Sequence, residues 1–260
     1  ESGGGDTGMV TVTSTGTGTD TAWKPHARFV FPEMLLGVTS EVVSREGGSP
    51  GSNAPFVGLI KYRKSWIRPT FLGQTDISSF ALDFTDDSLT LSRRELIPRG
   101  APRVLPMVDL RPMGAPVFHY AVLVEELWIN GERHRPEGDR PVYVVFDSGT
   151  TGMLVDRNLF DTSEFGLGTF ECHMRLRAED GSLVTVGNSR KTCTNKCLFV
   201  TLPIDVLWTG FENCHIIFAG LALMFNQGSL TVDADTRRLK LGGSPGPLVC
   251  EDEVWFLADA

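Results

Sequence analysis

The chain has no apolar run long enough to cross a bilayer, which argues against a membrane span. Its longest candidate, Ile216–Phe225, is far too short and is interrupted by Gly220. Positive charge is also scarce, because 24 basic residues face 32 acidic ones and the formal net charge is -8. A nucleic-acid partner therefore has no electrostatic support in this sequence.

Cysteine is scarce too, and its five copies all lie in the last third of the chain: Cys172, Cys193, Cys197, Cys214 and Cys250. Such clustering favours local disulfides in an oxidising compartment, with reduced, partly buried thiols as the alternative. Zinc is a third alternative, since a histidine follows both Cys172 and Cys214. No second close cysteine pair completes a finger-like spacing, so we expect no metal site and no cofactor.

Turn-forming residues are plentiful, and they separate many short apolar runs. The 260 residues include 28 glycines and 15 prolines, a composition that favours strands joined by turns. We therefore expect an all-β protein with few, short helices, one of them starting within Arg157–Phe160. The expected strands and hairpins are Phe80–Phe84 with Leu89–Leu91, Tyr120–Ile129 before the Asn130-Gly131 turn, Val142–Phe146, and Ser229–Asp233 with Arg238–Leu241.

One segment carries a chemical signal. The apolar run Val142–Phe146 leads directly into Asp147, which is followed by Ser148, Gly149 and Thr150. A buried strand that ends on an acidic residue places a carboxylate beside buried apolar residues, where a solvated charge is not expected. Gly149 permits a tight turn, and the hydroxyls of Ser148 and Thr150 can donate hydrogen bonds to the carboxylate. An ordinary surface turn is the alternative explanation of this triplet.

The segment Phe146-Asp147-Ser148-Gly149-Thr150-Thr151 resembles the catalytic loop in the second lobe of pepsin-like aspartic proteases, which reads hydrophobic-Asp-Thr/Ser-Gly-Thr-Ser/Thr. The resemblance extends in order over about residues 20–243. It departs from the family at Val57, where Asp is usual, and near Ala219-Gly220, where the family has Gly-Asp. The other similar segments are Ala54–Ile60, Phe80–Leu91, His119–Gly131, Ile216–Leu223 and Ser229–Gly242.

The resemblance implies a bilobal fold whose N-terminal lobe is incomplete in this chain. Residues 1–19 would be a flexible Gly/Thr-rich tail, and residues 20–110 the remainder of the N-terminal lobe with the inter-lobe region. Residues 111–243 would be the C-terminal catalytic lobe, and residues 244–260 a C-terminal tail. The compartment that it implies is the secretory pathway, a vacuole or lysosome, or the extracellular space.

The implied activity is that of an aspartic endopeptidase, which hydrolyses peptide bonds with two aspartates and an activated water. Asp147 would be one aspartate, supported by Ser148, Gly149 and Thr150. The other D-T-G, at Asp6, lacks an apolar strand before it, so the first loop is expected from a separate N-terminal light chain or an upstream segment. The alternative is an inactive pepsin-like binding or structural subunit. The implied partner is a peptide or protein substrate.

Further residue roles follow from position or from the resemblance. Thr151 and Met153, just past the loop, are the expected substrate-pocket residues. The family carries one bridge in its second lobe, which implies a disulfide from Cys172 to Cys193 or Cys197. His119, His173 and His215 are expected to be ordinary surface or strand residues, and Asp205 and Trp208 to serve in packing and turns.

Overall fold

The structure is a computed structural model, and it describes residues 58–85, 88–135, 140–150, 152–161, 171–188, 201–208 and 210–242. Its strands are β1 Ser79–Asp83, β2 Ser88–Ser92, β3 Leu105–Pro106, β4 Ala121–Ile129, β5 Glu132–His134, β6 Val142–Phe146, β7 Met153–Asp156, β8 Cys172–Arg177, β9 Leu183–Asn188, β10 Thr201–Ile204, β11 His215–Ala219, β12 Ser229–Asp233 and β13 Arg238–Leu241. Its helices are η1 Leu72–Gln74, η2 Arg111–Met113, α1 Arg157–Asp161, η5 Phe211–Asn213 and α2 Leu221–Phe225.

These elements confirm, for the described residues, an all-β chain with few and short helices. The long strand, the buried strand and both hairpins lie where the sequence predicts them, and α1 begins at Arg157. The turn between β4 and β5 has the expected chemistry, because Asn130 and Gly131 have φ values of 52° and 83°. Positive φ at both central residues is what a two-residue hairpin turn requires.

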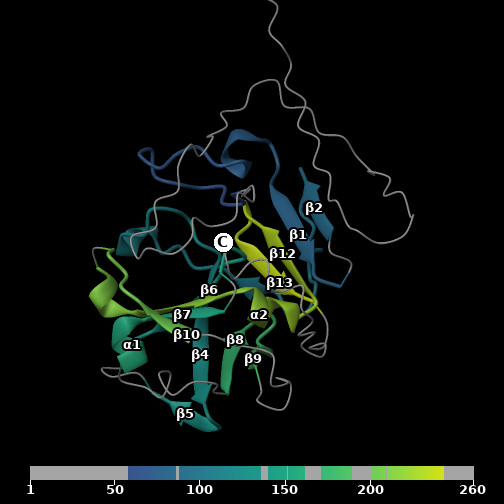
Figure 1. The fold of residues 1–260 in the computed structure, drawn as a ribbon. Coiled ribbons are helices and arrows are strands. Elements are labelled where there is room, and N and C mark those ends of the chain that lie inside the picture. The colour runs from purple at the N-terminus through teal and green to yellow at the C-terminus, as the bar shows by residue number, and fades with distance from the viewer. Residues whose placement is uncertain are drawn as a thin grey trace, which may run out of the picture.

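The strands form two sheets (Figure 1). The first has the order β2-β1-β12-β13-β3, so it joins strands from early in the chain to the last two described strands. The second has the order β10-β7-β11-β6-β4-β8-β9, with β5 paired to β4. The first sheet therefore combines strands from both sides of residue 110.

The centre of the second sheet has an unusual connection. Strands β6 and β7 follow one another in sequence, yet they are not neighbours, because β11 lies between them. Strand β11 runs parallel to β6 and antiparallel to β7. The segment from Asp147 to Gly152 therefore crosses over the end of β11 instead of closing a hairpin.

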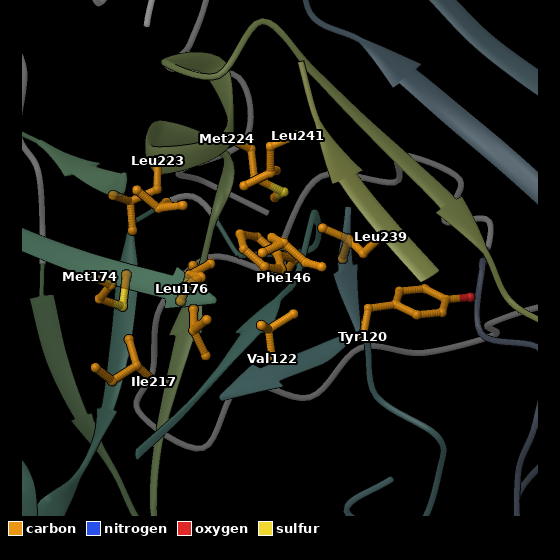
Figure 2. Packing of buried hydrophobic residues seen from close by; sticks show 14 of the residues in the cluster. Tyr120, Val122, Phe146, Met174, Leu176, Ile217, Leu223, Met224, Leu239 and Leu241 are labelled. Atoms are coloured by element: carbon orange, nitrogen blue, oxygen red, sulfur yellow. The ribbon is translucent and has the colours of Figure 1, made fainter. Parts of the chain in front are cut away.

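Strands β6 and β11 are buried on both faces, which explains the continuous apolar sequence of β6 and the apolar run that follows His215 in β11. Alternate residues of β6 enter different clusters: Val142, Val144 and Phe146 enter the main core, whereas Tyr143 and Val145 pack into a smaller cluster on the opposite face. Figure 2 shows Phe146 among core side chains that include Val122 of β4 with Leu239 and Leu241 of β13. The main core thus links the two sheets, and the strand that leads to Asp147 is anchored in it.

Candidate functional site

Asp147 lies directly after β6, all five residues of which are buried. The backbone N–H of Asp147 donates to the carbonyl oxygen of Ala219 at 3.0 Å, which carries the β6–β11 pairing one residue further. Asp147 itself is partly buried, whereas Ser148 and Gly149 are exposed. The prediction that a buried strand delivers this carboxylate is confirmed.

Both oxygens of the Asp147 carboxylate are held by its own loop. The backbone N–H of Gly149 donates to Oδ1 at 2.9 Å, and the Thr150 hydroxyl donates to Oδ2 at 3.0 Å. The N–H of Thr150 also donates to the carbonyl oxygen of Asp147 at 3.1 Å, which closes the turn. Two donors, one to each oxygen, fix the plane of the carboxylate. Thr150, one of the two predicted hydroxyl donors, makes this contact.

The end of β11 supports the loop from behind. The N–H of Gly220 donates to the carbonyl oxygen of Gly152 at 2.9 Å, and that of Leu221 donates to the carbonyl oxygen of Thr150 at 2.8 Å. A Cβ atom on Gly220 would lie 2.3 Å from both of these carbonyl oxygens. Only glycine allows such a close approach, which explains why position 220 is a glycine. These contacts argue against an ordinary surface turn at Asp147.

The two residues expected in a substrate pocket have different outcomes. Thr151 lies outside the described residues. Met153, the first residue of β7, is 0% exposed and belongs to the main core, where it pairs with Ala219 of β11. In this structure the side chain of Met153 is therefore a core residue and has no exposed surface for a substrate.

His119 lies at the same end of the β4–β6 pair as Asp147, since the N–H of Phe146 donates to the carbonyl oxygen of Tyr120 at 3.0 Å. Its imidazole stacks on Trp208 with ring centroids 5.1 Å apart and meets the edge of Phe218 at 6.0 Å. Burial lowers the pKa of His119 to about 4, while the negative charge of Asp147 acts in the opposite direction. The sequence gives no local signal for this proximity, because the two residues lie on different strands.

Another histidine, unlike the half-buried His119, is fully buried. His215, at the start of β11, is 1% exposed, and its Nδ1 lies 3.2 Å from both carboxylate oxygens of Asp156, which is 0% exposed. Asp156 also accepts the N–H groups of Ile216 at 3.0 Å and Leu159 at 3.1 Å. The carboxylate therefore caps α1 and joins it to β11. Sequence reasoning treated His215 as ordinary and did not single out Asp156.

Most of the residues that the cysteine predictions concern lie outside the described part of the chain. Cys193, Cys197 and Cys250 lie there, as does Asp6, so the expected bridge from Cys172 stays a prediction. Cys214 is buried, with its sulfur 3.7 Å from the sulfur of Met113. Within the described ranges, no group of three or more Cys, His, Asp or Glu side chains is arranged to hold a metal ion. Nor is any helix in those ranges long and apolar enough to cross a membrane.

No protein-family model matches this chain, and no curated protein does either. The functional argument therefore depends on the geometry around Asp147.

Proposed function

We propose that this chain carries one half of the active site of an aspartic endopeptidase. The observation that supports this is the Asp147 carboxylate, placed at the end of a buried strand and held by the Gly149 N–H and the Thr150 hydroxyl. Its loop is supported by Gly220 and Leu221, and these contacts give the carboxylate a fixed orientation. Orientation of this kind is what an acid–base catalyst needs.

In the proposed reaction, one ionised carboxylate takes a proton from a water molecule while the water oxygen attacks the peptide carbonyl carbon. A second, protonated carboxyl group gives its proton to the departing nitrogen as the carbon–nitrogen bond breaks. Two carboxyl groups so close together share a single proton, because like charges disfavour double ionisation. Asp147 is one member of this pair, in a pepsin-like bilobal fold.

We propose that the second carboxylate lies outside the described residues. The buried carboxylates among the described residues, Asp156 and Asp233, each have partners of their own away from Asp147. Asp156 pairs with His215, and Asp233 accepts the N–H groups of Leu96 at 2.8 Å and Ile97 at 3.0 Å. We propose that a segment not in this chain, either upstream or a separate light chain, supplies the first Asp loop.

A second candidate function is a pepsin-like scaffold that binds a protein or peptide without cutting it. The observation that favours it is the lack, within the described ranges, of any second carboxylate at the Asp147 loop. The residues that follow β11 also depart from the family, since Gly220 is followed by Leu221 where the family has Asp after Gly. A scaffold needs the loop only for its shape, so Asp147 would be dispensable for binding.

The test is cleavage of an unstructured peptide at acid pH by two proteins, the 260-residue chain and the full translated product of its gene. We expect no cleavage by the shorter chain. We expect pepstatin-sensitive cleavage by the longer product, and Asp147→Asn should reduce it by a factor on the order of 10² to 10⁴. Asp205→Asn, which changes an exposed partner of Arg157, is the matched control.

Two outcomes would contradict the proposal. If the longer product does not cleave, or if Asp147→Asn cleaves as well as the wild type, the scaffold function is favoured. If the 260-residue chain cleaves by itself and Asp147→Asn abolishes the cleavage, the second carboxylate is inside this chain, and Asp6 is the first residue to substitute.

A further inference from the structure

His119 is a second titratable group beside the Asp147 loop, and aromatic side chains surround it. The imidazole is stacked against Trp208, with 23° between the ring planes, and Phe218 of β11 meets it edge-on. Trp208 is itself held by edge contacts with Phe211 at 6.4 Å and Phe218 at 6.5 Å. The ring of His119 is therefore fixed by its neighbours, and it sits beside the loop that carries the carboxylate.

The hydrogen bonding of His119 is incomplete. Its Nε2 atom is buried and has no hydrogen-bond partner in the described part of the chain. A buried polar atom without a partner is costly, and the cost rises when the ring carries a charge. The ring is therefore held neutral over most of the pH range by the packing around it.

The charged groups around His119 are few. Among the described residues, Asp147 is the one ionisable group whose charge acts on the ring. The elements packed against the imidazole contribute Trp208 and Phe218, which carry no charge. Asp205, on the same segment as Trp208, is exposed and makes two hydrogen bonds to Arg157, at 2.6 and 3.0 Å.

We propose that His119 is a positioning residue of the Asp147 site, and that its protonation sets the charge that the carboxylate faces. This inference rests on the proposed function for its consequence in catalysis. While the ring is neutral, Asp147 has an uncharged aromatic neighbour and can share a proton with a second carboxyl group. Once the ring takes a proton, its positive charge favours the ionised carboxylate and opposes that sharing.

The consequence for activity is a loss of cleavage on the acid side. Burial lowers the pKa of His119 to about 4, so this loss should set in as the pH falls through that value. In the full translated product, His119→Phe should keep an uncharged ring and retain cleavage to lower pH than the wild type. His119→Gln is a second variant, and His173→Asn, which changes a half-buried histidine that contacts Glu171, is the control that should leave the pH profile unchanged.

A second experiment tests the coupling without any activity. The ring Cε1–H signals of the 260-residue chain are followed by NMR against pH, in the wild type and in Asp147→Asn. We expect the wild-type His119 to titrate at about pH 4. Because the carboxylate attracts the imidazolium, its removal should lower that value by roughly half a unit or more. Asp205→Asn should not change it.

The two experiments separate failure of the inference from failure of the proposed function. If His119 titrates near the ordinary histidine value of about 6.5, or is unaffected by Asp147→Asn, the inference is wrong, whatever the cleavage assay shows. If the coupling is present but the longer product does not cleave peptides, the proposed function is wrong and the coupling remains. An unchanged acid limb in an active His119→Phe variant would also overturn the inference.

Discussion

The imidazole of His215 and the carboxylate of Asp156 form a hydrogen-bonded pair inside the protein, with Nδ1 3.2 Å from both oxygens. The pair joins β11 to the β7–α1 junction, since Asp156 also accepts the N–H groups of Ile216 and Leu159. Strand β11 is the strand that supports the Asp147 loop. A buried carboxylate at the end of β7, the strand that follows the loop, therefore helps to fix the geometry of the loop.

Asp156→Asn should destabilise the fold. The amide has one acceptor oxygen in place of two, so it leaves buried N–H groups without a partner, at a cost of about 2–4 kcal/mol in the free energy of unfolding. Urea unfolding at pH 7 measures this cost. Asp205→Asn is the matched control, because Asp205 and Arg157 form an exposed ion pair, and its unfolding curve should stay close to that of the wild type. Equal unfolding midpoints for the two variants would show that the buried pair stabilises the fold no more than the exposed ion pair does.

Gly220→Ala should be more damaging than a glycine substitution elsewhere. The new methyl group would lie 2.3 Å from the carbonyl oxygens of Thr150 and Gly152, so the loop or β11 has to move. We expect a loss of at least about 2 kcal/mol in the free energy of unfolding, together with loss of any activity of the site. Gly58→Ala is the control, since its methyl group would meet nothing closer than Thr70 at 4.0 Å. If Gly220→Ala is as stable as Gly58→Ala, the packing described for this loop is incorrect.

The stability of His119→Phe relative to the wild type should depend on pH. The pKa of His119 falls from 6.5 to about 4 on folding, so the unfolded chain binds this proton first, and the folded state loses stability as pH falls from about 6.5 to 4. Each unit of difference in pKa between the folded and unfolded states corresponds to about 1.4 kcal/mol, so the loss of folding free energy approaches roughly 3 kcal/mol. His119→Phe lacks this loss, so its advantage over the wild type should grow toward pH 4 and then level off.

Urea unfolding of both proteins between pH 7.5 and pH 3.5 tests this expectation, at a pH spacing of about half a unit. The value at pH 7.5, where histidine is neutral, gives the packing effect of the substitution alone. A stability difference that is the same at every pH would contradict the prediction, even if the variant is more or less stable overall.

Thr150→Val and Thr150→Ser should separate the hydroxyl group from the shape of the side chain. Valine keeps the branched shape but removes the donor to Oδ2 of Asp147, a hydrogen bond of 3.0 Å. Hydrogen bonds to charged groups contribute about 1.5–3 kcal/mol, so Thr150→Val should lose stability in this range at pH 7. Thr150→Ser retains the donor and should lose less. The reverse order would mean that packing of the methyl group outweighs the hydrogen bond.

Much of the local structure was predictable because it is encoded over a few residues. The Asn130-Gly131 turn, the apolar β6 and the β12–β13 hairpin each follow from neighbouring residues. The short helix α2 was not predicted, since the apolar run Ile216–Phe225 gives no periodicity that separates a strand from a helix over so few residues. Within this run, strand β11 ends and helix α2 begins on either side of Gly220.

The arrangement of the candidate site was predictable only in part. The sequence pointed to Asp147 and to a hydroxyl from Thr150, since all the relevant residues lie in one short segment. It could not place His119 beside the loop or bury Asp156 against His215, because these contacts depend on which distant strands pair. The pairing of β4 with β6 decides the first contact, and the insertion of β11 between β6 and β7 decides the second; no local pattern specifies either.

The order of strands in the first sheet has a consequence for how the chain folds. Strand β1 pairs with β2 on one side and with β12 on the other, and Ser79 lies opposite Asp233 near the other end of the described chain. Loop closure over such a distance is slow. During synthesis, the edge of β1 that pairs with β12 stays unpaired until the β12–β13 hairpin has left the ribosome. An open edge of this kind is a site for wrong pairing with other chains. The yield of correctly folded protein should therefore depend on how soon β12 and β13 reach β1.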